Sequence, residues 1–320
     1  MSDFSNVLSV FYRISDSPTP DKCCPRQVCF INFISVFKGL PITVVADNCG
    51  PQTLDFVKQS GLPVIETSLG NSGSFLKCLE LGEKAETMFS YFSEDDYIYR
   101  DNAPQLIVEG LRWSNYVTLY DHPDKYIKER GYGEVGRCLK TETWHWRQTI
   151  STCCTFGANV NLLRQDMEVF KKHCQGKIPA DHAAWCELSQ RQRSLTAAIP
   201  GAAFNTHRVS EHSNFDWGVT WASGQIKRVV DAINQQGRFQ QPPESVKFQP
   251  LEVPKTTSGL PSLAALGRTS TPPQLTRGVT LAMPDPAALH RENMNKKKYT
   301  LQPGEFGLLT PTTPDTTSPK

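Results

Sequence analysis

The sequence predicts an α/β protein in which a mostly parallel sheet is flanked by helices. Apolar stretches typical of strands alternate with helix-like stretches through the first hundred residues. Strand–helix–strand alternation indicates a parallel sheet, because each helix carries the chain back to the edge where the last strand began. Residues 241–320 differ: they hold 13 of the 23 prolines and no cysteine or tryptophan. Such a segment buries too little apolar surface to offset its ordering entropy. We expect one α/β domain over residues 1–240 and a disordered tail over residues 241–320.

The first half of the domain contains the most regular pattern. Pro25 suits the first turn of a helix, and Gly61 suits the position after the last turn of one. The stretch Gly70-Asn71-Ser72-Gly73-Ser74 is expected as a turn before a helix. Strands are expected at residues 7–12, 42–46, 63–67 and 88–93, and helices at 25–39, 51–60 and 75–84.

The second half continues the alternation less regularly. Two strand-like stretches, at residues 144–149 and 153–156, suggest a hairpin. Asp181 stands at or near the start of a helix, where a carboxylate is a favourable cap. Further strands are expected at residues 116–120 and 197–201, and helices at 104–113, 159–173, 179–188 and 226–233.

Composition excludes some classes of protein. The net charge of +2 among 320 residues gives no field that would attract nucleic acid or an anionic membrane. No apolar run approaches the length of about 18 residues that indicates a membrane-spanning helix. The first residues lack the basic and apolar character of a signal peptide. We therefore expect a cytoplasmic protein, in which the ten cysteines are reduced thiols. The spacing of these cysteines matches no zinc pattern.

Three acids, Glu94, Asp95 and Asp96, follow the fourth expected strand. Arg13 follows the first strand, and Asp47 and Asn48 follow the second. Parallel strands deliver such residues to one edge of the sheet, where open α/β sheets bind ligands. Adjacent carboxylates repel one another unless a positive group lies on them, and divalent cations prefer carboxylate oxygen. A metal-assisted nucleotide site and a solvated acidic turn are both compatible with this stretch. Neither GxGxxG after the first strand nor GxxxxGK[ST] is present.

The order of these parts resembles a GT-A glycosyltransferase, similar to the family 2-type enzymes, over residues 5–235. The segments that carry the resemblance are Asp47-Asn48, Gly70-Asn71-Ser72-Gly73, Glu94-Asp95-Asp96, Thr155-Phe156-Gly157, Asp181-His182 and Thr206-His207. The resemblance implies transfer of a hexosyl-type sugar from a nucleotide-sugar, with UDP-sugars favoured, to a glycan or other hydroxyl acceptor. It also implies Mn²⁺ or Mg²⁺ as the cofactor. The Gln-x-x-Arg-Trp motif of processive synthases is absent, so we expect single transfers.

Roles at the donor site follow from the resemblance position by position. The acidic cluster, with Glu94, binds the nucleotide-sugar, and Asp96 is its metal ligand. Asp95 is expected near the ribose or joined to the metal through water. Further donor contacts are expected from residues at the same edge: Arg13, Asp47, Asn48, Asn71 and Gly73. Gly73 would let the main chain approach the donor closely, because glycine lacks a side chain.

The later residues complete the expected site. An inverting enzyme needs a general base for the acceptor hydroxyl, and the resemblance gives this role to Asp181. A plain helix cap is the alternative for Asp181. His207 is expected as a further metal ligand, with His212 as its rival, and either could be an ordinary loop histidine. Two other functions stay open: a nucleotidyltransferase that makes a nucleotide-sugar, and a non-catalytic nucleotide- or glycan-binding module.

Overall fold

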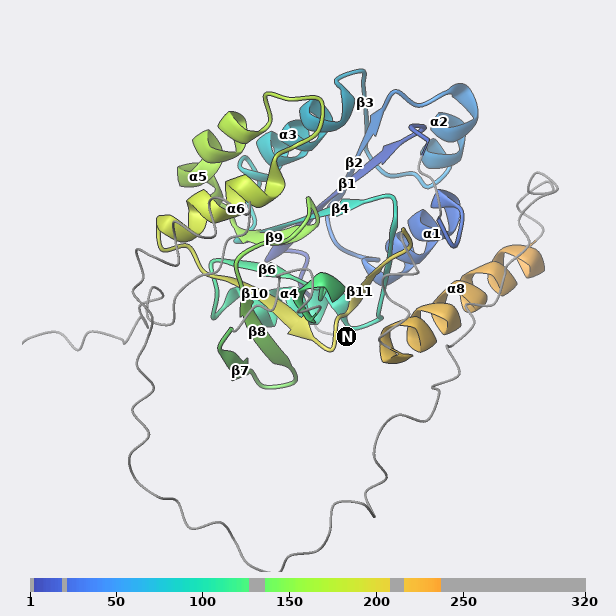
Figure 1. Cartoon of the computed structure of the whole chain (residues 1–320). Coiled ribbons are helices and arrows are strands. Elements are labelled where there is room, and N and C mark those ends of the chain that lie inside the picture. The colour runs from blue at the N-terminus through green and yellow to red at the C-terminus, as the bar shows by residue number, and fades with distance from the viewer. Residues whose placement is uncertain (1–2, 19–21, 127–135, 208–215, 237–320) are drawn as a thin grey trace, which may run out of the picture.

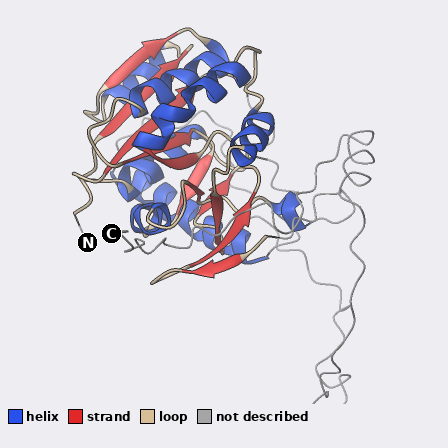
Figure 2. Cartoon of the chain, turned by 90° about the vertical axis from the view of Figure 1, so that its left-hand side faces the viewer, coloured by secondary structure: helices blue, strands red, loops and turns tan. Residues whose placement is uncertain are grey.

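The computed structural model describes residues 3–18, 22–126, 136–207 and 216–236, which form a sheet covered by helices on both faces (Figures 1 and 2). The strands are β1 Leu8–Ser15, β2 Ile42–Asp47, β3 Val64–Thr67, β4 Phe89–Glu94, β5 Tyr97–Tyr99, β6 Tyr116–Thr118, β7 Cys138–Lys140, β8 His145–Thr149, β9 Phe156–Asn159, β10 Leu195–Ile199 and β11 Ala203–Asn205. The helices are α1 Arg26–Val36, α2 Pro51–Lys58, α3 Gly70–Gly82, α4 Ala103–Leu111, the 3₁₀ helix η1 Pro123–Tyr126, α5 Val160–His173, α6 Asp181–Gln190 and α8 Asp216–Gln236.

The main sheet has nine strands in the order β3-β2-β1-β4-β9-β6-β10-β8-β7. Strands β3, β2, β1 and β4 are mutually parallel, and so are β6 and β10. Strands β9 and β8 run against their neighbours. The pairings therefore leave seven strands in one direction and two reversed, which confirms the predicted mostly parallel α/β fold. Strands β5 and β11 form a separate antiparallel pair.

The two faces of the sheet are buried in two apolar clusters, because successive side chains of a strand point to opposite faces. Along β1, Val10 and Tyr12 enter a cluster with α1 and α4, whereas Phe11 enters a cluster with α3, α5 and α6. Figure 1 shows α3, α5 and α6 together on one side of the sheet and α1 on the other. Helix α8 packs on α1 and on the β5–β11 pair. Both faces of the central strands are thus buried, and only their ends remain for a site.

Several local expectations were wrong. Residues 144–149 and 153–156 form no hairpin with each other: β8 pairs with β7 and β10, and β9 lies between β4 and β6. Asn71, Ser72 and Gly73 belong to the first turn of α3 rather than to a turn before it. The short strands β5, β7 and β11 were not expected, and α8 extends further in both directions than residues 226–233. The expected tail, residues 241–320, lies outside the described residues. Within the described part of the chain, no helix combines the length and apolarity that crossing a membrane requires.

Candidate active site

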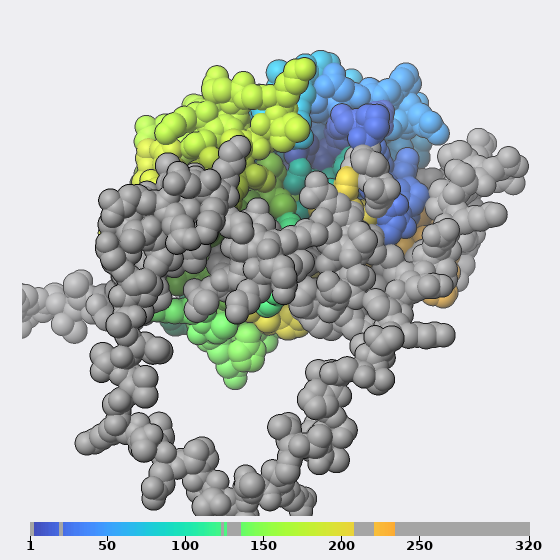
Figure 3. Space-filling model, viewed as in Figure 1, coloured from blue at the N-terminus to red at the C-terminus, as the bar shows by residue number. Residues whose placement is uncertain are grey.

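The C-terminal ends of β1, β2 and β4 bring three expected residues to one edge of the sheet. Arg13 in β1 is aligned with Glu94 at the end of β4. Asp47 at the end of β2 is aligned with Ser15 of β1. In the space-filling view, the yellow-green α5–α6 segment and the blue β2–α3 segment stand on either side of a deeper strip (Figure 3). The edge that sequence reasoning identified is therefore assembled by these parallel pairings.

Arg13 and Glu94 form an ion pair beside the first turn of α3. The Arg13 side chain is largely buried, and its Nη1 donates to Oδ1 of Asn71 at 2.6 Å and to the Asn71 main-chain oxygen at 2.7 Å. The second oxygen of Glu94 accepts a 3.4 Å hydrogen bond from the Thr155 hydroxyl. Arg13, Asn71 and Glu94, expected as separate donor contacts, thus form one hydrogen-bonded group that fixes α3 and β9 against β4.

Asp95 is held by two cations, one from the connection between β1 and α1 and one from the first residue of α1. Its Oδ1 lies 3.1 Å from Lys22 Nζ, and its Oδ2 lies 3.5 Å from Arg26 Nη1. The main-chain N–H of Ser15 also donates to Oδ2 at 3.2 Å. The carboxylate is therefore neutralised by protein groups, in an arrangement unlike that of a free metal ligand. Sequence reasoning missed Lys22 and Arg26, because no local signal shows that they reach an acid some 70 residues away.

Asp96 is the acid of the cluster with an unsatisfied oxygen. Its Oδ1 is buried and has no hydrogen-bond partner among the described residues, whereas Oδ2 accepts only a 3.3 Å bond from Asn205. Burial, together with the charges of Glu94 and Asp95, raises the pKa of Asp96 to about 7. A buried carboxylate oxygen without a donor is costly, and a divalent cation would satisfy it. This oxygen fits the expected cation.

Thr206 and His207 directly follow β11, and Thr206 holds the backbone of Asp96. Both the N–H and the hydroxyl of Thr206 donate to the Asp96 main-chain oxygen, at 2.7 and 2.9 Å. The N–H of His207 donates to the Asn205 side chain at 2.7 Å. No group of three or more His, Cys, Asp or Glu side chains able to hold a metal occurs in the described ranges. His207 as a ligand stays a prediction, and His212 lies outside the described residues.

Asp47, at the end of β2, is hydrogen-bonded to neighbouring parts of the chain. Oδ1 of Asp47 accepts from the N–H of Leu69 at 2.6 Å and from the Thr67 hydroxyl at 2.8 Å. Its Oδ2 accepts from the Asn48 side chain at 2.8 Å. A Cβ added to Gly73 would lie 2.7 Å from the Leu69 Cβ, so close packing in α3 requires glycine there. The Asp47 carboxylate is thus already hydrogen-bonded to protein groups. Contacts of Asp47, Asn48 and Gly73 with a nucleotide stay predictions.

A further acid at the edge, Asp16, was missed. It follows β1 directly and accepts 2.7 Å hydrogen bonds from the Gly50 N–H and the Thr53 hydroxyl at the start of α2. Arg26 lies 3.4 Å from the same carboxylate. The expected strand ended at residue 12, whereas β1 extends to Ser15, so the sequence did not show that Asp16 follows a strand end. Asp16 and Asp95 together locate Arg26 between the first strand and the acidic cluster.

Asp181 is the first residue of α6, and its Oδ1 accepts a 2.7 Å bond from the adjacent His182 N–H. Burial raises the pKa of Asp181 above its ordinary value, and the nearby Glu94 charge adds to the increase, whereas the His182 N–H and His122 oppose it. Glu94 and Asp181 therefore belong to one electrostatic region.

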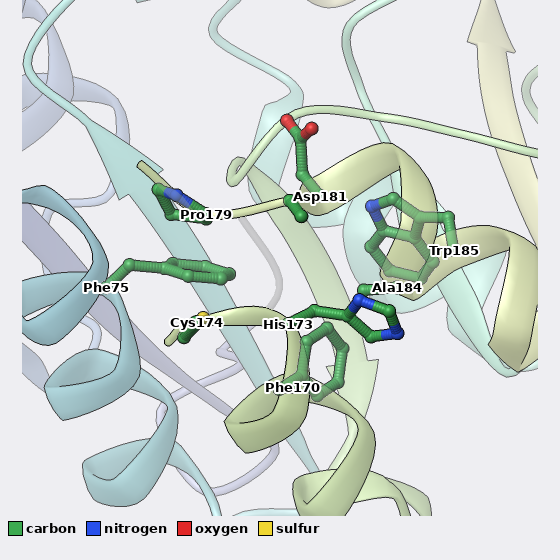
Figure 4. Close-up of a pocket in the computed structure, with 9 residues that line it drawn as sticks. Phe75, Phe170, His173, Cys174, Pro179, Asp181, Ala184 and Trp185 are labelled. Carbon is green, nitrogen blue, oxygen red and sulfur yellow. The ribbon is translucent and has the colours of Figure 1, made fainter. Parts of the chain in front are cut away.

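An apolar hollow lies beside Asp181, lined by Phe75, Phe170, Pro179 and Trp185 among others. In Figure 4 the Asp181 carboxylate points away from the rings of Phe75 and Phe170. The aromatic residues thus support the start of α6, and the acid is presented outward from them.

Comparisons with known proteins find distant similarity to solved structures. No family model and no curated protein sequence matches the chain. The bifunctional IspDF of Campylobacter jejuni is 14% identical over 57% of this chain and 47% of that chain, with a TM-score of 0.34. A cytidylyltransferase from Leptospira borgpetersenii is 9% identical over 72% of this chain and 94% of its own, with a TM-score of 0.41.

A glucosyl-3-phosphoglycerate synthase from Mycobacterium tuberculosis, solved with Mg²⁺ and UDP, is 12% identical over 54% of this chain and 67% of its own, with a TM-score of 0.33. The chain thus spans about half of the IspDF enzyme and two thirds of the synthase. The neighbours thus include a cytidylyltransferase and a glucosyl-3-phosphoglycerate synthase, each at a TM-score below 0.5.

Proposed function

We propose that the chain is a glycosyltransferase that moves a sugar from a nucleotide-sugar, with a UDP-sugar favoured, to a hydroxyl acceptor. The observation that carries the proposal is the unsatisfied Oδ1 of Asp96, buried at the strand ends beside two acids that basic side chains already neutralise. This arrangement leaves one carboxylate oxygen available to a bound cation in a region where parallel sheets bind nucleotides.

The donor end of the site combines one acid with several bases. Asp96 and His207 would hold Mn²⁺ or Mg²⁺, which when bound supplies charge neutralisation to the departing diphosphate. Lys22 and Arg26, held in place by Asp95, add positive charge that suits phosphate oxygens. Arg13 and Asn71 have a positioning role. Their mutual hydrogen bond and the Arg13–Glu94 ion pair keep Glu94 and the start of α3 in position.

Asp181 is the proposed general base of an inverting transfer. It removes the proton of the acceptor hydroxyl as that oxygen attacks the anomeric carbon from the face opposite the leaving diphosphate. A helix N-terminus stabilises the ionised carboxylate and weakens it as a base. Burial and Glu94 act against this effect by raising the pKa of Asp181, so the carboxylate is a stronger base than one in water.

A nucleotidyltransferase is the second candidate, and the positions of Lys22 and Arg26 favour it. Lys22 lies in the connection after β1 and Arg26 is the first residue of α1; both reach the acidic cluster, so they could bind a triphosphate. In that reaction a phosphate oxygen of the sugar phosphate attacks the α-phosphate, and pyrophosphate leaves. The glycosyltransferase instead releases a nucleoside diphosphate, so the identity of the product separates the two functions.

Thermal unfolding with UDP, GDP, CDP or dTDP, each with and without Mn²⁺, tests the donor site. A ligand that binds the folded protein raises the melting temperature by mass action. We expect one nucleotide to give a Mn²⁺-dependent increase in the wild type and none in Asp96→Asn. Asp101→Asn is the matched control, because Asp101 lies in an exposed ion pair with Arg228. Retention of the full metal-dependent shift by Asp96→Asn would refute the assignment.

Turnover of the donor found in this way tests the chemistry. Asp181→Asn should retain the nucleotide-dependent shift but lower kcat by about 10²–10⁴-fold, the usual contribution of a general base. Release of the nucleoside diphosphate supports glycosyl transfer, and release of pyrophosphate from a nucleoside triphosphate supports the second candidate. Nucleotide binding without turnover of either substrate class would indicate a binding module.

A further inference from the structure

Three cysteine thiols lie together where the connection after β1 enters α1. The sulfurs of Cys24 and Cys29 are 3.7 Å apart, and Cys23 is the residue directly before Cys24. Cys24 and Cys29 are buried in an apolar cluster with Ile98, Ile226 and Val229 of β5 and α8. None of the three is in a disulfide. We name Cys23, Cys24 and Cys29 the thiol trio.

The members of the thiol trio differ in exposure and acidity. Cys23 is partly exposed, whereas Cys24 and Cys29 are buried. The neighbouring Cys24 thiol lowers the pKa of Cys23, and the thiols of Cys23 and Cys29 raise the pKa of Cys24. Because the thiolate is the nucleophile, Cys23 is both the reachable and the more reactive thiol, and its neighbour keeps its proton.

We propose that the thiol trio is an oxidation site at which a hydroperoxide produces a Cys24–Cys29 disulfide, with Cys23 as the entry thiol. The Cys23 thiolate attacks the peroxide, the O–O bond breaks, and Cys23 sulfenic acid forms as an alcohol or water leaves. The Cys24 sulfur displaces the hydroxyl group as water, which gives a Cys23–Cys24 disulfide. The Cys29 thiolate then attacks the Cys24 sulfur and releases Cys23 as a thiolate. Overall, two thiols lose two electrons and two protons, and the peroxide is reduced.

The thiol trio is covalently continuous with the cations of the candidate active site. Lys22 directly precedes Cys23, and Arg26 lies two residues beyond Cys24. Both cations contact Asp95. A disulfide holds its sulfurs at about 2.05 Å, so closure from the observed 3.7 Å shifts the chain between these two cations.

A second connection runs through Thr206. Its hydroxyl oxygen lies 3.9 Å from the Cys29 sulfur and donates to the Asp96 main-chain oxygen. Its own main-chain oxygen accepts from the Cys23 N–H at 2.9 Å. We therefore expect oxidation to lower nucleotide affinity. This consequence rests on the proposed function, whereas formation of the disulfide does not.

Thiol titration and peptide mapping of the full chain test the site directly. The folded protein is treated with hydrogen peroxide, unreacted thiols are alkylated, and the intact mass and peptides are measured. We expect two of the ten thiols to disappear first, with a loss of about 2 Da and a Cys24–Cys29 linked peptide. Dithiothreitol should restore both thiols. Cys138→Ser, which removes an exposed thiol outside the trio, should leave this pattern unchanged.

Two variants distinguish the proposed route from general oxidation. Cys29→Ser should stop at a Cys23–Cys24 disulfide or a Cys23 sulfenic acid, and Cys23→Ser should slow formation of the Cys24–Cys29 disulfide severalfold. Uniform oxidation of all the thiols, or a first disulfide at other cysteines, would overturn the proposal. Loss of the nucleotide-induced thermal shift after oxidation, and its return with dithiothreitol, tests the link to the active site. If no nucleotide binds the reduced protein, the proposed function fails while the disulfide result still stands.

Discussion

Replacement of Asp96 by asparagine should stabilise the protein in the absence of divalent cations, although it removes the proposed metal ligand. Asp96 is partly buried, with its Oδ1 shielded from solvent, and its pKa rises from the ordinary 3.8 to about 7 on folding. Well below pH 3.8 the carboxyl is protonated in both the folded and the unfolded chain, so it causes no difference. As the pH rises from 4 to 7, the unfolded chain releases this proton more readily than the folded chain, and stability falls.

The magnitude follows from the two pKa values. Each tenfold difference in proton affinity corresponds to about 1.4 kcal/mol, so a pKa that moves from 3.8 to about 7 corresponds to roughly 4 kcal/mol. Asparagine has nearly the same shape and no charge, so it avoids this loss. Above pH 7, Asp96→Asn should therefore have a free energy of unfolding larger than that of the wild type by up to about 4 kcal/mol, and the two should converge near pH 4.

Urea unfolding of both proteins at pH 4, 5, 6, 7 and 8 in the presence of a chelator measures this difference. Titration of other groups affects both proteins, so the difference between the two curves isolates Asp96. Asp95→Asn is the control of opposite sign: it removes the partner of Lys22 and Arg26 and should destabilise the protein at neutral pH. A difference between wild type and Asp96→Asn that does not change with pH would refute the reasoning.

Two further predictions concern groups that support the site. Arg13→Ala should lower the free energy of unfolding by about 3–5 kcal/mol, because it removes a largely buried cation and leaves the partly buried Glu94 unpaired. A loss below about 1 kcal/mol in urea unfolding would contradict this. Gly110→Ala should cost about 1–3 kcal/mol by overpacking, because the new Cβ would lie 2.6 Å from the Trp146 ring. Gly224→Ala in α8 is the control for this change, because a Cβ there meets no atom within 4 Å. Alanine favours a helix more than glycine does, so Gly224→Ala should raise the melting temperature. Equal effects of the two changes would show that packing is not the cause.

The sequence alone determined the regular half of the sheet and the edge where the site lies. Alternation of apolar strands with helices is a local pattern, so β1 to β4 and α1 to α3 could be recognised from it. Arg13, Asp47 and Glu94 then came to one edge because parallel strands end together. The acidic cluster and the helix start near Asp181 could also be recognised from short stretches of sequence.

Only the tertiary structure decided the second half of the sheet and the role of each acid. Reversed β9 lies between β4 and β6, and β8 lies beyond β10, because strand partners are chosen by packing across the whole domain. Lys22 and Arg26 neutralise Asp95, whereas Asp96 receives a single side-chain donor from Asn205, 109 residues away. Partners so distant in sequence leave no periodic signal. The charge and availability of a carboxylate depend on burial and on those partners, so three adjacent acids that look alike in the sequence differ in the folded protein.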